Sequence, residues 1–195
     1  MNKRSSRRQL ILETLALELE ARPFDKLSTA RLAASVGVSE AALYRHFASK
    51  AQMYEALIEY AEETVFPRFN QILAQHQGLE AVVRDMCAVV VGFAERNPGI
   101  ARVLGGDILL GEDPRLRART SKFFQRIETQ IKQVMREARA SAAYGANVRD
   151  PVVDSAIVVK HLVGSLELYI RSGFQRQPRA EFEQEWEVLR GVLLN

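Results

Sequence analysis

Polar side chains that suit contacts with nucleic acid are concentrated between residues 28 and 50. Tyr44 and His46 can donate hydrogen bonds to phosphates, and Lys50 can place a positive charge beside the free N–H groups at a helix start. Arg45 can bind guanine or a phosphate, and Glu40 can accept a hydrogen bond from cytosine. The predicted nucleic-acid contacts are Ser28, Thr29, Arg31, Ser39, Glu40, Ala42, Tyr44, Arg45, His46 and Lys50.

The same segment has the pattern of two short helices joined by a tight turn. We predict helices over residues 29–36 and 40–47, with Gly37 in the turn and a capping serine before each helix. This arrangement is typical of a helix-turn-helix, whose second helix lies in the major groove of DNA. An ordinary helical hairpin with a solvated polar face is the alternative. The residues spaced to pack inward are Leu32, Val36, Leu43 and Phe47.

Apolar residues recur at helical spacing along the whole chain, so we expect an all-α protein of about nine helices. A first helix should end before Pro23, because the residue before a proline favours an extended backbone. A fourth helix should begin after Ser49, where Gln52 completes a capping box, and Pro67 should kink or end it. The later helices are expected near residues 79–96, 115–139, 152–172 and 180–193, with a short helical piece around Leu104 and a loop over 140–150.

This reading divides the chain into two domains. Residues 1–50 form a three-helix, helix-turn-helix DNA-binding domain, and residues 51–195 form a helical domain for dimerisation and partner binding. The last two helices carry apolar residues that a twofold pair of subunits would bury. The predicted dimer contacts are Ile157, Val158, Leu162, Leu166, Leu189 and Val192.

Positive charge is concentrated at the N-terminal end. The whole chain carries 27 Lys and Arg against 24 Asp and Glu, a net charge of +3, whereas residues 1–50 carry nine against five, a net of +4. That asymmetry favours a nucleic-acid-binding module. The basic N-terminal residues either follow the DNA phosphates or the minor groove, or form a disordered solvated tail. They are Lys3, Arg4, Arg7 and Arg8.

Other residue types point away from catalysis and from a membrane span. His46, His76 and His161 stand far apart in unlike contexts, and there is no HExxH, phosphate loop or GxGxxG. We therefore expect no enzymatic activity, no metal and no cofactor. Cys87 is the only cysteine, and its apolar surroundings predict a buried structural thiol. Without a signal peptide or a run of about 18 apolar residues, the sequence favours a cytoplasmic location.

The string LAASVGVSEAALYRHF, followed by a lysine at the next helix start, resembles the DNA-binding domain of the TetR family. The ERNPG at residues 95–99 and the RIETQIKQVMRE at 126–137 resemble the nucleoid-occlusion subgroup of that family. The likeness covers roughly residues 8 to 140. It implies a homodimer, with one or two dimers on each palindromic site in double-stranded chromosomal DNA. It also implies that the protein is associated with the nucleoid.

The subgroup also implies a protein partner. DNA-bound members antagonise polymers of the tubulin-like division protein FtsZ, whose C-terminal tail docks between the fourth helix and the C-terminal domain. The positions here that match the docking region are Tyr60, Arg68, Val89, Gly92, Arg96 and Asn97.

Two departures from the family's pattern bear on these expectations. Ala48 stands where a proline is common, which predicts a less rigid start to the fourth helix, and Pro67 adjoins Arg68 in the docking region. The chief alternative function is a transcriptional repressor that responds to a small molecule, which is the commoner role in the family. Such a repressor should have a large apolar cavity inside its C-terminal bundle.

Overall fold

The computed structural model describes residues 3–75, 78–140 and 150–193, and within those ranges the chain is helical without any β-strand. Its long and short helices follow one another as expected, with one additional turn of 3₁₀-helix. They are α1 (Lys3–Ala21), α2 (Thr29–Val36), α3 (Glu40–Tyr44), α4 (Lys50–Ala74), α5 (Leu79–Arg96), α6 (Pro98–Gly105), η1 (Asp107–Leu109), α7 (Pro114–Ala140), α8 (Pro151–Arg171) and α9 (Pro178–Leu193).

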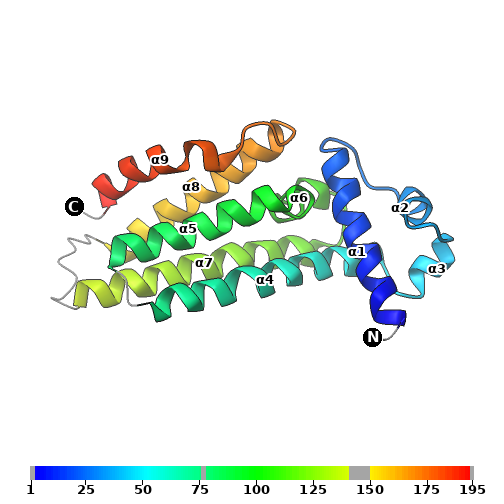
Figure 1. Cartoon of the computed structure of the whole chain (residues 1–195), viewed down its shortest axis with the longest axis horizontal. Helices are drawn as coiled ribbons and strands as arrows, with labels where there is room; N and C mark the ends of the chain where they lie inside the picture. The colour runs from blue at the N-terminus through cyan, green and yellow to red at the C-terminus, as the bar shows by residue number, and fades with distance from the viewer. Residues whose placement is uncertain (1–2, 76–77, 141–149, 194–195) are drawn as a thin grey trace.

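The helices form an elongated bundle with a small three-helix unit at one end (Figure 1). Helices α4, α5, α7, α8 and α9 run along the long axis, while α1 crosses the end of the bundle and α2 and α3 lie beyond it. Buried apolar side chains form one cluster that extends from Ile11 in α1 to Trp186 in α9. The three-helix unit is therefore packed onto the bundle rather than tethered by a linker.

Local signals account for the two short helices. The Ser28 hydroxyl accepts a hydrogen bond from the backbone N–H of Arg31 at 3.4 Å, and Ser39 accepts from Ala42 at 3.2 Å. Gly37 ends α2 with φ of 75°, a left-handed conformation that a residue with a Cβ rarely adopts. The inward-facing residues predicted from their spacing are all buried: Leu32, Val36, Leu43 and Phe47.

The third helix is shorter than predicted. It ends at Tyr44, and the chain then turns, with the N–H groups of His46 and Phe47 both donating to the carbonyl of Leu43. The apolar spacing that suggested a helix to residue 47 reflects the burial of Phe47 after this turn, because a turn can place a side chain in the core as well as a helix can.

The start of α4 is held by a variant of the predicted capping box, in which Gln52 accepts from the residue before the N-cap serine. Ser49 accepts from the N–H of Gln52 at 3.2 Å, and the Gln52 side chain accepts from the N–H of Ala48 at 2.8 Å. A proline at position 48 has no N–H to donate. The departure from the family's proline therefore adds a hydrogen bond at this helix start, and does not simply loosen it.

Pro67 does not end α4, which continues to Ala74. The proline ring is exposed, whereas Phe66 and Phe69 on either side are buried against α7 and the core. Phe66 packs against Phe123 of α7, with ring centroids 5.5 Å apart. Packing of these aromatic side chains offsets the loss of one backbone hydrogen bond, so of the two predicted outcomes termination is wrong.

The three-helix unit is fixed to the bundle through α6. A Cβ on Gly99 would lie 2.0 Å from the carbonyl oxygen of Ala16, so α6 approaches the backbone of α1 as closely as only glycine permits. Arg102 of α6 is 3% exposed and donates to the carbonyls of Arg22 and Asp25 at 2.8 Å each. Its guanidinium also pairs with Asp107 at 3.0 Å, which satisfies the buried charge.

Candidate nucleic-acid and partner interfaces

Three of the predicted nucleic-acid contacts gather at and just beyond the end of α3. Tyr44 and Arg45 are exposed and His46 is half-buried, and their side chains make no hydrogen bond or ion pair within the described ranges. Ala42, one turn earlier, is small enough to let a DNA backbone come close. This end of α3 therefore presents unpaired donors to solvent, as a recognition helix requires.

The other polar residues of the helix-turn-helix are engaged within the chain. Thr29 donates to Glu40 across the two helices at 2.7 Å, and the hydroxyls of Ser28 and Ser39 serve as helix caps. The structure thus separates the predicted set into unpaired side chains near the end of α3 and side chains that hold α2 and α3 together.

Arg31 on α2 is also held by neighbouring groups. Its guanidinium pairs with Glu18 at 3.1 Å and with Asp25 at 3.7 Å, and it donates to the carbonyl of Lys26 at 3.3 Å. These contacts join α2 to α1 and to the connection between them. Arg31 is therefore available to DNA only in part, because both carboxylates offset its charge.

Lys50, at the start of α4, lies in a cluster that sequence reasoning did not foresee. Its ammonium donates to the carbonyl of Leu27 at 3.3 Å, forms an ion pair with Glu112, and lies 5.8 Å from the centre of the Tyr54 ring. The partner carboxylate is 62 residues further along the chain, after the left-handed Gly111. Only the glycine hinted at an unusual turn there.

The basic N-terminal residues are part of α1, which begins at Lys3, and do not form the disordered tail that was the alternative. Arg7 is exposed, and the Arg8 guanidinium lies 4.8 Å from the ring centre of Phe47. Two cations therefore lie on α1, one of them next to the turn that follows α3. The side chains of Lys3 and Arg4 lie outside what the structure describes.

Three of the six predicted partner positions line one groove. Val89, Gly92 and Arg96 follow one face of α5, and Ile72 of α4 and Arg179 of α9 contribute to the same hollow. The Arg96 guanidinium lies over Gly92, 3.2 Å from where a Cβ would stand. Because Gly92 has no side chain, the arginine can lie flat along the helix at the edge of the groove.

Two further positions line a neighbouring hollow beside α1. Tyr60, which is 45% exposed, and Asn97 line it together with residues of α1, α4 and α6. Phe93 links the two hollows, because its ring lies 6.3 Å from that of Tyr60 and its carbonyl accepts from Asn97 at 2.8 Å. Arg68, on the exposed side of α4, donates to Gln71 at 3.1 Å and to no other residue within the described ranges. Five of the six positions therefore line two adjoining hollows, whereas Arg68 lines neither of them.

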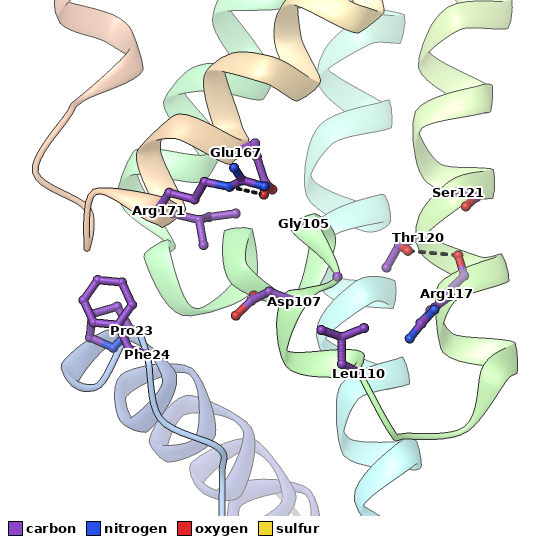
Figure 2. A pocket seen from close by; sticks show the side chains of 12 residues that line it. Pro23, Phe24, Gly105, Asp107, Leu110, Arg117, Thr120, Ser121, Glu167 and Arg171 are labelled. Atoms are coloured by element: carbon purple, nitrogen blue, oxygen red, sulfur yellow. Dashed lines mark hydrogen bonds and ion pairs between the residues drawn. The ribbon is translucent and has the colours of Figure 1, made fainter.

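A larger hollow, of about 670 Å³, opens where the three-helix unit meets the bundle (Figure 2). Exposed Phe24 and Leu110 line it, together with the charged side chains of Asp107, Arg117 and Arg171. This hollow lies at the domain junction. It is not the apolar cavity inside the bundle that a ligand-responsive repressor was expected to have.

The predicted dimer surface needs correction. Val158, Leu162 and Leu166 of α8 are at most 2% exposed, because they pack into the core of their own subunit. Helix α8 is apolar on more than one side, so spacing alone cannot tell which side faces a partner. The exposed large apolar residues on α8 and α9 are Val152, Val153, Ile157, Val163, Leu168, Val188 and Val192.

The remaining expectations concern Cys87, metals and membranes. Cys87 is buried as predicted, and burial raises the pKa of its thiol to about 12. In the described ranges, no three His, Cys, Asp or Glu side chains come together as metal ligands would. Within the same ranges, none of the helices combines the length and apolar character needed to cross a bilayer.

Comparisons with known proteins find a matching family for each half of the chain. Residues 11–57 match the family of bacterial regulatory proteins of the tetR type, and residues 77–193 match a tetracyclin repressor-like C-terminal domain of the SlmA-like kind. Two curated relatives, both "Nucleoid occlusion factor SlmA", are similar over nearly their whole length. The one from Colwellia psychrerythraea is 45% identical, covering 96% of this chain and 94% of its own. The one from Alteromonas mediterranea is 44% identical, covering 98% of each.

Solved structures agree on the architecture. A TetR transcription regulator from Haloarcula marismortui superposes with a TM-score of 0.79 over 98% of this chain and 100% of its own, at 13% identity. At that identity the likeness concerns the fold alone. Fold and site together define a helix-turn-helix DNA-binding protein with a helical C-terminal domain. The chain belongs to the TetR family and, within it, to the SlmA group of nucleoid occlusion factors.

Proposed function

We propose that this protein is a nucleoid-occlusion factor. As a homodimer it binds palindromic sites in chromosomal DNA, and in the DNA-bound state it inhibits assembly of the FtsZ ring over the nucleoid. The observation that best supports this is the 45% identity to a nucleoid occlusion factor over 96% of the chain, because it extends through the partner-binding half as well as the DNA-binding half.

DNA recognition rests on α3 and its flanks. The unpaired Tyr44, Arg45 and His46 side chains suit a helix that lies in the major groove, with Arg45 able to bind guanine. A twofold axis through the exposed apolar faces of α8 and α9 would pair two such helices. Palindromic half-sites one turn of duplex apart, about 34–36 Å, match that arrangement.

Partner recognition rests on the groove between α4 and α5. Arg96 lines it with an exposed guanidinium group, Val89 and Ile72 supply apolar wall, and Arg68 is exposed one turn before Ile72 on α4. A short peptide with acidic and apolar side chains fits this chemistry, because arginine pairs carboxylates through two parallel hydrogen bonds. The FtsZ C-terminal tail is the proposed occupant. Chromosomal DNA and FtsZ as partners imply a protein that acts at the nucleoid, in the cytoplasm.

A pull-down of FtsZ from the same organism tests this function. Duplex sites are first selected from genomic fragments with the purified protein, and FtsZ capture is then compared with and without a selected duplex. The proposal expects a palindromic site and stronger FtsZ capture in its presence. Selection of a site without any FtsZ capture would favour the ligand-responsive repressor. Failure to select any duplex would contradict both functions.

A further inference from the structure

We propose that Glu112 competes with a DNA phosphate for the ammonium of Lys50, and so sets the affinity of the helix-turn-helix for DNA of any sequence. This inference rests on the proposed function, because it takes Lys50 to contact the DNA backbone. It assigns a role in DNA binding to the loop between η1 and α7, which lies in the C-terminal half of the chain.

The Lys50 ammonium is already bound by acceptors of its own chain. Its side chain is 22% exposed and that of Glu112 is 21% exposed, so the ion pair is largely shielded from water. The ammonium also donates to the carbonyl of Leu27, which directly precedes the helix-turn-helix. A lysine held in this way reaches a phosphate only by exchanging one of its acceptors. The carboxylate is the acceptor that a phosphate can replace charge for charge.

Lys50 also lies at a helix start, where a positive charge is unfavourable. It is the first residue of α4, where free N–H groups and the helix dipole disfavour a cation and favour an anion. Glu112 offsets that unfavourable placement. A DNA phosphate at the same place would satisfy the lysine and the helix start together, and it would repel the carboxylate that now lies there. Phosphate and Glu112 therefore exclude each other.

Glu112 is held in place by its loop. Gly111 is left-handed, with φ of 85°, and the N–H of Glu112 donates to the carbonyl of Leu109 at 3.1 Å. On the other side Asp113 accepts from the N–H of Arg115 at 2.9 Å. Because the backbone on both sides is fixed, the carboxylate opposite Lys50 is a built feature of the fold.

The Tyr54 ring, near which the Lys50 ammonium lies, adds no competing charge. The Tyr54 hydroxyl is buried without a hydrogen-bond partner in the described ranges. Burial, with the Glu112 charge as a further cause, raises the pKa of Tyr54, so the hydroxyl keeps its proton. The neutral hydroxyl does not compete with Glu112 for the lysine ammonium, so the carboxylate is the anion that a phosphate must displace.

Glu112→Gln tests the competition, because it removes the charge and keeps the shape. Affinity for a selected palindromic duplex and for an unrelated duplex should both rise about fivefold in 100 mM salt, as expected for the loss of one competing ion pair. The gain should disappear when Lys50→Ala is also present. Glu55→Gln is the matched control, since it makes the same charge change near Lys50 and on the same helix. It should leave affinity within about twofold of the wild type.

Three results would overturn the inference while leaving the proposed function intact. They are unchanged or weaker DNA binding by folded Glu112→Gln, a gain that persists without Lys50, and an equal gain from Glu55→Gln. A merely structural role for Glu112 cannot produce tighter binding. If Glu112→Gln fails to fold, Glu112→Ala is measured in the same way. Wild-type protein that binds neither duplex would contradict the proposed function itself.

Discussion

The proposed DNA-binding surface and the proposed peptide groove differ in how their positively charged side chains are paired. At the DNA-binding end, Arg31 pairs with two carboxylates and Lys50 with Glu112, so only part of the positive charge faces solvent unpaired. Along α4 and α5, Arg68 and Arg96 are exposed and no carboxylate pairs with either in the described ranges. Carboxylates of the same chain offset part of the positive charge on the first surface, whereas the two arginines of the second keep their full charge. A DNA-binding protein that must leave non-specific DNA benefits from moderation, while a peptide groove that recognises a few carboxylates needs its arginines unpaired.

Replacing Gly99 with alanine should have the largest effect, because it forces apart the junction that joins the two surfaces. The new Cβ would lie 2.0 Å from a backbone oxygen of α1, which cannot move without displacing the whole helix. We expect a loss of about 3 kcal/mol or more in the free energy of unfolding. Thermal denaturation measures it. Gly78→Ala at the N-cap of α5, where φ is −61° and no atom lies within 4 Å, is the control and should cost less than about 1 kcal/mol. Equal melting temperatures for the two variants would contradict the close approach of α6 to α1.

Loss of the dimer should be the next largest effect. Val153 of α8 is 51% exposed and lies on the surface assigned to the partner subunit. An aspartate there would bury an unpaired charge in the interface, so light scattering at micromolar concentration should give the monomer mass of 22.0 kDa. Wild-type protein should give about 44 kDa. A wild-type monomer would remove the twofold arrangement on which palindrome recognition rests.

Charge reversal in the groove should separate the two surfaces. Arg68→Asp and Arg96→Asp should each abolish binding of the FtsZ tail peptide. Each replaces an arginine that could pair with a peptide carboxylate by an aspartate that repels it. Both variants should bind the operator normally, since neither residue lies in the helix-turn-helix. Fluorescence anisotropy with labelled peptide and labelled duplex measures both. Arg136→Asp, on the exposed side of α7, is the control and should bind both ligands. Normal peptide binding by both groove variants would show that the peptide docks elsewhere.

The smallest expected effect is that of Lys50→Ala on DNA binding. If Lys50 contacts one phosphate in the complex, its loss should weaken binding to all sequences about equally. It should also reduce the slope of log affinity against log salt by about 0.9. A salt titration that leaves the slope unchanged would mean that Lys50 stays with Glu112 even on DNA.

Short-range signals made much of the fold predictable. Ser28, Ser39 and Ser49 mark helix starts because each hydroxyl accepts from the N–H three residues further on, and Gly37 marks a helix end through its own backbone. Features that depend on distant residues were less accessible. Pro67 looked like a helix end because only the packing of its neighbours against α7 shows why α4 continues.

The sites show the same division. The exposure of the candidate DNA contacts Tyr44 and Arg45 could be predicted from spacing, whereas His46 is half-buried in the turn after α3. The Lys50–Glu112 pair could not, since nothing in the sequence relates two residues 62 positions apart. The sequence also could not separate the core residues of α8 from its exposed apolar residues. Ile157 and Val158 are both apolar, and only the folded bundle decides which is buried.

Sedimentation of FtsZ polymers tests the central claim most directly. Polymerised FtsZ is pelleted with this protein present, once with a selected palindromic duplex and once with a scrambled duplex of the same length. The account predicts that the palindrome sharply reduces the pelleted FtsZ, that the scrambled duplex does not, and that Arg96→Asp removes the effect. Equal amounts of pelleted FtsZ with the two duplexes would contradict it.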